Sequence, residues 1–135
     1  QIWHLAQVRE GMHLGDHTKI GQGSYMGPGI YIGAFTKIQN SAMVFEPASL
    51  GTGVFIDPGA VIANGRNPQA IYSQGLPEVP PNCNAVGVVA HDGASIGASA
   101  TCIAAWLLGK EQRHFLITSH VQCRERSAEH HNNVA

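Results

Sequence analysis

An aliphatic residue or methionine stands at every sixth position through the first half of the chain. A period of six is a multiple of the two-residue strand repeat and not of the 3.6-residue helical repeat, so only extended structure keeps these side chains on one face. Short strands that stack coil upon coil would bury them in one continuous column. The pattern therefore predicts an all-β parallel β-helix built from hexapeptide repeats. The residues at this core position are Ile2, Val8, Leu14, Ile20, Met26, Ile32, Ile38, Val44, Leu50, Ile56 and Ile62.

Two further positions of each hexad favour small residues. The residue directly after the core position is often glycine, which we expect because glycine adopts backbone angles that a Cβ atom would penalise. The residue four after the core position is mostly small or β-branched, as at Thr18, Ser24 and Ala42. Both preferences indicate tight turns between short strands. The glycines that follow a core residue are Gly15, Gly21, Gly27, Gly33 and Gly51.

The phase of the repeat is lost after Ile62 and returns at Ala90. Four prolines in between would interrupt a strand ladder, so we expect a loop inserted between two coils at about residues 64–89. A long loop that leaves a rigid coil can complete a neighbouring pocket. Residues 1–109 are therefore the predicted β-helix, and residues 110–135, which show no hexad phase, are an atypical tail. The repeat resumes at Ala90, Ile96, Cys102 and Leu108.

Composition and charge argue against several classes of protein. Eight Lys and Arg against nine Asp and Glu offer no electrostatic basis for binding nucleic acid. No apolar run approaches the roughly 18 residues of a membrane-spanning helix, and the first residues lack a signal-peptide pattern, so a cytoplasmic protein without membrane contact is expected. The three cysteines match no zinc template, so free thiols and no metal cofactor are expected.

The segment LGDHTKIGQGSYMGPGIYIGAFTKIQN at 14–40 resembles the hexapeptide-repeat acyltransferases. Within that family the sequence is most similar, over roughly residues 2–109, to the N-acetyltransferases of UDP-2-acetamido-3-amino-2,3-dideoxyglucuronate. Four segments carry that similarity: IWH at 2–4, IGQGSYMGPG at 20–29, KIQN at 37–40 and VFIDPGAVIANGRNPQA at 54–70. The resemblance implies a left-handed parallel β-helix that assembles as a homotrimer. It also implies transfer of an acetyl group from acetyl-CoA to the amino group of a nucleotide-linked sugar, in bacterial surface polysaccharide synthesis. The amine is itself the nucleophile, so the protein must position it and stabilise the oxyanion.

The same resemblance suggests which residues hold the acceptor. Asn64 stands where the family has an asparagine at the sugar site, and we expect it to orient the amine; the alternative is an asparagine that serves only a turn. Gln39 and Asn40 are expected one coil below Asn64, near the acceptor sugar, with an internal amide ladder as the alternative. Gln22 could join them.

Phosphate and donor contacts are expected further along the chain. Arg66 and Asn67 open the inserted loop and could contact the nucleotide phosphates, because a guanidinium pairs well with phosphate; a solvated loop charge is the alternative. Small residues in the later coils would let the pantetheine arm of acetyl-CoA lie along the backbone. These candidate donor-site residues are Gly97, Ala98, Ser99 and Ala104.

Other functions remain open from the sequence. His91 could act as the base of an O-acetyltransferase on a sugar or small alcohol. A zinc enzyme on the same scaffold needs three histidines that converge from adjacent subunits, two of them five residues apart, whereas His13 and His17 are four apart. A non-catalytic β-helical scaffold or an inactive fragment is the third alternative, since both ends of the repeat look incomplete. Aromatic residues at non-core positions would suit packing in a trimer or a binding surface: Tyr25, Tyr31, Phe35, Phe45 and Phe55.

Overall fold

The computed structural model describes residues 1–65, 87–103 and 107–108. All of the regular structure in these segments is short parallel strand, and no helix long and apolar enough to cross a membrane occurs in them. The strands are β1 (Gln7–Val8), β2 (His13–Leu14), β3 (Lys19–Ile20), β4 (Tyr25–Met26), β5 (Tyr31–Ile32), β6 (Lys37–Ile38), β7 (Met43–Val44), β8 (Ser49–Leu50), β9 (Phe55–Ile56), β10 (Val61–Ile62), β11 (Val89–Ala90), β12 (Ser95–Ile96), β13 (Thr101–Cys102) and β14 (Leu107–Leu108).

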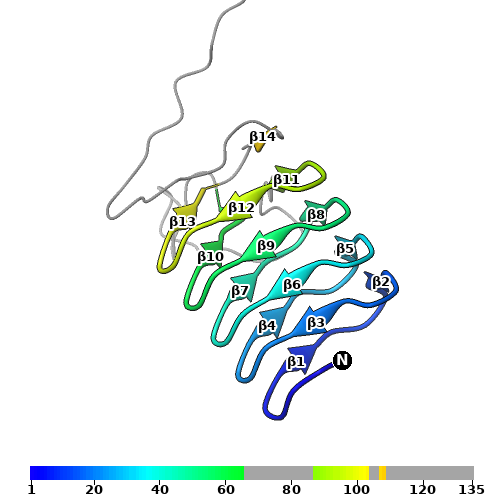
Figure 1. Cartoon of the computed structure of the whole chain (residues 1–135). Coiled ribbons are helices and arrows are strands. Elements are labelled where there is room, and N and C mark those ends of the chain that lie inside the picture. The colour runs from blue at the N-terminus through cyan, green and yellow to red at the C-terminus, as the bar shows by residue number, and fades with distance from the viewer. Residues whose placement is uncertain (66–86, 104–106, 109–135) are drawn as a thin grey trace, which may run out of the picture.

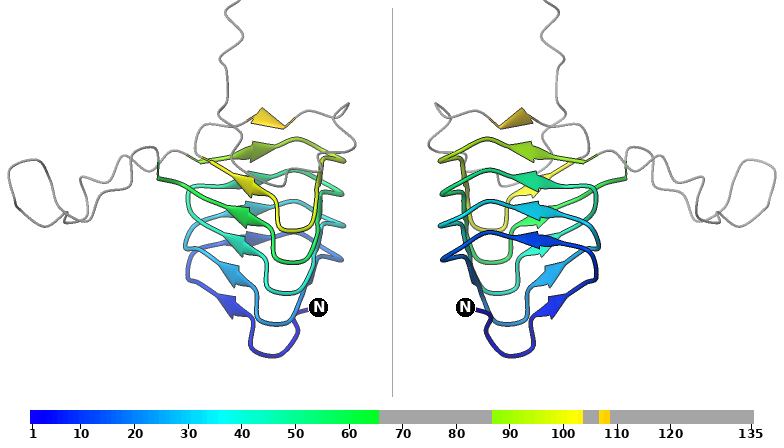
Figure 2. Two further views of the ribbon diagram at one scale, coloured as in Figure 1. Left: turned by 90° about the vertical axis from the view of Figure 1, so that its left-hand side faces the viewer. Right: turned by 90° about the vertical axis from the view of Figure 1, so that its right-hand side faces the viewer.

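Successive strands go to three different sheets, and every third strand returns to the same sheet (Figure 1). One sheet has the order β1-β4-β7-β10-β13, the second β2-β5-β8-β11-β14 and the third β3-β6-β9-β12. Gln7 of β1 lies opposite Tyr25 of β4, so three hexads make one coil. The side views show the coils stacked one upon another (Figure 2). The predicted all-β fold, a parallel β-helix of hexapeptide repeats, is confirmed.

The predicted core positions form the interior of the stack. From Ile20 to Ile62 every one of them is at most 2% exposed, and Ala90, Ile96 and Cys102 continue the column after the insertion. Burying each large aliphatic side chain contributes roughly 1.5–3 kcal/mol. Exposure rises in the first coil, where Val8 is 37% and Ile2 is 50% exposed. The core is therefore one continuous column along the axis of the coils.

From Thr18 to Ala60 the position four after each core residue is also buried, and hydroxyl groups there bond to the neighbouring coil. The Thr36 hydroxyl donates to the carbonyl of Gly51 at 3.0 Å and accepts from the amide of Val54 at 3.2 Å. The Ser24 hydroxyl donates to the carbonyl of Gln39 at 2.9 Å. These bonds satisfy polar groups that would otherwise be buried without partners.

The expected reason for glycine after the core position is wrong. Positive φ angles occur two residues further on, at Gly53 among others, and that position also accepts side chains, as at Phe35 with φ of 59°. Gly33 has no positive φ, but a Cβ atom on it would lie 2.5 Å from the carbonyl carbon of Gly51. The same close approach of the next coil is found at Gly15, Gly21, Gly27 and Gly51, so glycine is favoured at these positions by the lack of room for a Cβ atom, whereas Gln39 and Asp57 carry side chains at the equivalent position of other hexads.

The β-helix continues in register on both sides of residues 66–86, which lie outside the described residues. Strand β11 pairs with β8, and Ser49 lies opposite Val89. The paired residues Phe55 and Ser95 are equally far apart in the sequence. In the coils before the insertion, by contrast, paired residues are only three hexads apart. The inserted segment therefore interrupts the sequence without disturbing the stack. Residues 110–135, the expected tail, also lie outside the described residues.

Candidate functional site

The three sheets form the three faces of a prism, and the turns between successive strands form its three corners. The turns of each corner stack on one another because each coil repeats the geometry of the one below. The first corner comprises the turns after β3, β6, β9 and β12, the second those after β1, β4, β7 and β10, and the third those after β2, β5, β8 and β11. Most of the predicted site residues lie on the first corner. They are Gln22, Gln39, Asn40, Gly97, Ala98 and Ser99.

Three of the amide residues predicted to bind substrate, Gln22, Gln39 and Asn40, come together on this corner. Gln22 follows β3 and Asn40 follows β6, one coil further along. The Asn40 Oδ1 atom accepts a hydrogen bond from the backbone amide of Gln22 at 3.0 Å. That bond seats the Asn40 side chain over Gly21, where a Cβ atom would lie only 2.7 Å from Oδ1. The amide oxygen of Asn40 thus joins the two coils, while Gln22 and Asn40 themselves stay exposed.

These amides line a groove on the outside of the sheet formed by β3 and β6, which we call the lysine groove. Its volume is about 340 Å³. Its two cationic side chains, Lys19 and Lys37, lie directly opposite each other in the parallel pair β3–β6. The lysine groove is lined by Trp3, His4, Lys19, Gly21, Gln22, Lys37, Ile38, Gln39 and Asn40.

Sequence reasoning missed the two lysines and the indole of Trp3 as site residues. The signal was present in the spacing: Lys19 and Lys37 each precede a core residue and stand three hexads, one full coil, apart. Trp3 lies in the coil before them, and its backbone amide donates to the carbonyl of Ile20 at 3.0 Å. The spacing alone would have placed both lysines on one outer face.

The structure places Asn64 on a different corner from the other amides. Asn64 follows β10 on the second corner, and the residue beneath it is Glu46, whereas the coil that stacks on Asn40 carries Pro58 and Gly59. The expectation that Gln39 and Asn40 lie one coil below Asn64 is therefore wrong. One hexad of chain, about 20 Å at full extension, separates Pro58 from Asn64.

A hydrogen bond holds the Asn64 side chain in a defined orientation. Its Nδ2 atom donates to the backbone carbonyl of Glu46. Because a carbonyl only accepts, the other end of the amide, Oδ1, is left as a hydrogen-bond acceptor. Asn64 is partly buried, so this acceptor lies at the rim of the second corner.

The carboxyl group of Glu46 differs from the equivalent side chains on the other two corners, because it accepts no backbone amide from the coil below. On the first and third corners, Asn40 and Asp92 each accept a backbone amide from the coil below, from Gln22 and Thr52. The Oε2 atom of Glu46 is seated in the same way, against the position that a Cβ of Gly27 would occupy.

The residue after Gly27 is Pro28, however, which has no N–H. Oε2 of Glu46 is buried and has no hydrogen-bond partner within the described part of the chain. A proline in the coil below therefore explains why one buried oxygen is left unpaired.

The predicted donor-site residues lie on the first corner, two coils beyond Gln39. Gly97, Ala98 and Ser99 follow β12, and Ser99 donates its amide to the carbonyl of Pro58 at 3.0 Å. Coils of parallel strands lie about 4.8 Å apart, which puts the two groups roughly 10 Å apart along the corner. Three other predicted site residues lie outside the described residues: Arg66, Asn67 and Ala104.

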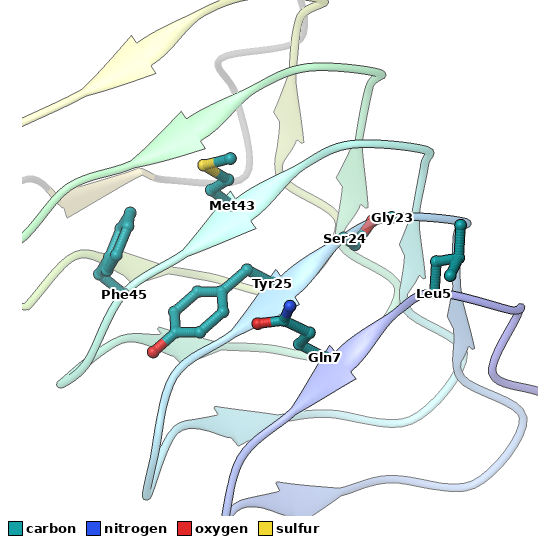
Figure 3. A pocket seen from close by; sticks show the side chains of 7 residues that line it. All are labelled: Leu5, Gln7, Gly23, Ser24, Tyr25, Met43 and Phe45. Atoms are coloured by element: carbon teal, nitrogen blue, oxygen red, sulfur yellow. The ribbon is translucent and has the colours of Figure 1, made fainter.

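A second groove, of about 290 Å³, lies on the neighbouring face of the prism, and we call it the aromatic groove. The rings of Tyr25 and Phe45 meet there at a centroid distance of 5.2 Å. Figure 3 shows Gln7 and Met43 projecting from the same face on either side of Tyr25. The aromatic groove is lined by Leu5, Gln7, Gly23, Ser24, Tyr25, Met43 and Phe45.

Three histidines suggested alternative functions in the sequence; two of them stack on aromatic rings, and the third is exposed. The ring of His13 stacks on Tyr31 at 4.6 Å, and that of His17 stacks on Phe35 at 5.1 Å. His91 is exposed on the third corner. Among the residues that the structure describes, no three side chains of His, Cys, Asp or Glu converge as metal ligands. The expectation that the protein needs no metal stays a prediction.

Comparison with known proteins adds no family name. No family model matches the sequence, and no curated protein matches it. The role of the chain must therefore be inferred from its grooves, its corners and its sequence motifs.

Proposed function

We propose that this protein is an acetyl-CoA-dependent N-acetyltransferase that acylates the amino group of a nucleotide-linked sugar. The observation that carries the proposal is the lysine groove, where three amide residues expected to bind the sugar stand beside two cationic side chains. Amides suit the hydroxyl groups of a sugar, and ammonium groups suit the phosphates of a nucleotide. The resemblance of four sequence segments to hexapeptide-repeat acyltransferases, on a stack of hexapeptide coils, supports the same reaction class.

The reaction needs no activated side chain from the protein, because the amine of the sugar is itself the nucleophile. The neutral amine attacks the carbonyl carbon of the thioester, a C–N bond forms, and the C–S bond breaks. The proton lost by the amine goes to the departing thiolate, which leaves as the thiol of CoA. What the protein supplies is position, because bringing two reactants into a fixed geometry removes much of the entropic barrier.

Asn64 fits the role of orienting the amine. Since its Nδ2 atom is engaged by the carbonyl of Glu46, its Oδ1 atom can accept one amine N–H and direct the nitrogen lone pair at the thioester. The donor would lie along the first corner, where Gly97, Ala98 and Ser99 offer little side-chain bulk. A site that used both Asn64 and the lysine groove would need two subunits, which agrees with the homotrimer implied by the resemblance.

The test measures thiol release from acetyl-CoA by the purified chain, with and without a 3-amino nucleotide sugar. We expect release that depends on the sugar. Asn64→Ala should lower kcat at least about tenfold, the usual scale for losing one positioning hydrogen bond, while the melting temperature changes little. Gln7→Ala, an exposed amide on the face between the corners, is the matched control and should leave the rate unchanged. Absence of sugar-dependent release would remove the proposed reaction.

A further inference from the structure

Two like charges face each other on the lysine groove. Lys19 and Lys37 are direct register partners in the parallel pair β3–β6, and both are exposed. Neighbouring parallel strands lie about 4.8 Å apart, and like charges directly opposite each other on a sheet are destabilising. The next residue of the same ladder is Phe55, so no acid interrupts the pair on that side.

Neither Lys19 nor Lys37 forms a salt bridge with an acid among the described residues. The ion pair in the described segments joins Arg9 to Glu10 at 3.0 Å, away from the lysine groove. The acid on the first corner, Asp57, follows β9 in the next coil and does not line the groove. The lysine groove therefore presents concentrated positive charge that a bound anion would balance.

An aromatic wall stands beside the two charges. Trp3 lines the same groove, and it is 50% exposed although its backbone is fixed by the hydrogen bond to Ile20. An exposed indole offers a flat surface on which a planar heterocycle can stack. The amides of Gln22 and Gln39 add hydrogen-bonding groups to the lining of the same groove.

We propose that the lysine groove binds the nucleoside diphosphate portion of a ligand, with the phosphates between Lys19 and Lys37 and the base stacked on Trp3. The groove, at about 340 Å³, has the size of a site for a small molecule. A nucleotide-linked sugar and CoA both carry a nucleoside diphosphate. The assignment of the groove to the sugar nucleotide rests on the proposed function. The inference that it binds a nucleoside diphosphate rests only on the two lysines and Trp3.

The experiment titrates the full chain with uridine diphosphate, CoA, inorganic pyrophosphate and uridine, using calorimetry. Tryptophan fluorescence is followed in a Trp106→Phe background, so that the signal comes from Trp3. We expect uridine diphosphate to bind and to be displaced by pyrophosphate, while uridine binds far more weakly. Stronger binding of CoA than of uridine diphosphate, with the same dependence on the lysines, would assign the groove to the donor.

Variants test each part of the groove. Lys19→Gln with Lys37→Gln should weaken binding of uridine diphosphate at least tenfold, and Lys19→Arg with Lys37→Arg should restore most of it. Arg9→Gln removes a cation outside the groove and is the matched control for charge; it should change nothing. Trp3→Ala should weaken uridine diphosphate about fivefold and leave pyrophosphate unaffected.

Two results would overturn the assignment: equal affinity of the double Gln variant and the parent chain, or uridine binding as tightly as its diphosphate. Acetyl transfer is measured separately on the same variants. Transfer with an unchanged KM in the double Gln variant refutes the groove and leaves the reaction standing. Lysine-dependent binding without any transfer upholds the groove and removes the proposed reaction.

Discussion

Replacing Gly33 by Ala should be far more damaging than replacing Gly53, although both lie in turns of the third corner. A Cβ atom on Gly33 would lie 2.5 Å from the carbonyl carbon and 2.6 Å from the carbonyl oxygen of Gly51. Both obstacles are backbone atoms, so no side chain can rotate away. Relief to an ordinary contact of about 3.4 Å needs a shift of nearly 1 Å between two coils.

The bonds around this contact set the magnitude. The amide of Gly33 donates to Leu50 at 2.8 Å, Gly53 donates to Ala34 at 2.8 Å, and the Thr36 hydroxyl donates to Gly51 at 3.0 Å. A shift of about 1 Å takes all three beyond bonding distance, and each buried bond lost costs about 1–1.5 kcal/mol. Gly33→Ala should therefore lower the free energy of unfolding by about 3–5 kcal/mol.

Gly53→Ala is the matched control. Gly53 has φ of 66°, and nothing lies within 4 Å of an added Cβ, so the cost is that of a left-handed conformation alone, about 1–2 kcal/mol. Urea unfolding followed by circular dichroism measures both variants against the parent chain. Equal losses for the two variants, or a larger loss at Gly53, would refute the explanation of glycine by close approach of the coils.

Two more predictions concern buried groups. Pro28→Ala supplies the missing N–H to Oε2 of Glu46. The control, Pro58→Ala, loses a proline without gaining a hydrogen bond, so the Pro28→Ala variant should be about 1.5 kcal/mol more stable than the Pro58→Ala variant. Equal urea midpoints for the two variants would contradict this. Burial raises the pKa of the Cys102 thiol to about 11 from an ordinary value of 9.0. The unfolded chain then releases this proton first, so stability should fall by roughly 1.4 kcal/mol per pH unit between pH 9 and 11, and Cys102→Ala should lose that share of the pH dependence.

The period of the sequence was sufficient to predict the coil and its interior. Every core position from Ile20 to Ile62 is buried, because a six-residue repeat in extended chain admits one inward face. The grouping of Gln22 with Asn40 follows from the same arithmetic, since three hexads, one coil, separate them. Local spacing thus determines what stacks on what.

The predicted position of Asn64, one coil above Asn40, was wrong because of the same count of hexads. Asn64 stands four hexads after Asn40 and not three, so it falls one corner further round the prism. The predicted role of the glycines was wrong for a different reason: a positive φ and a close approach of the backbone both favour glycine, and a sequence cannot distinguish the two causes. The structure separates the two cases at Gly33 and Gly53.

The pairing offset has a consequence for how the chain folds. Between β1 and β10 each strand finds its partner three hexads away, so the loops closed during folding are short and uniform. Where β11 meets β8 the loop is more than twice as long, which adds about 0.7 kcal/mol of closure entropy. Burial of a single core aliphatic exceeds that amount. We therefore expect the coils before the insertion to assemble first, and the coils after it to add onto their exposed edge as a slower step.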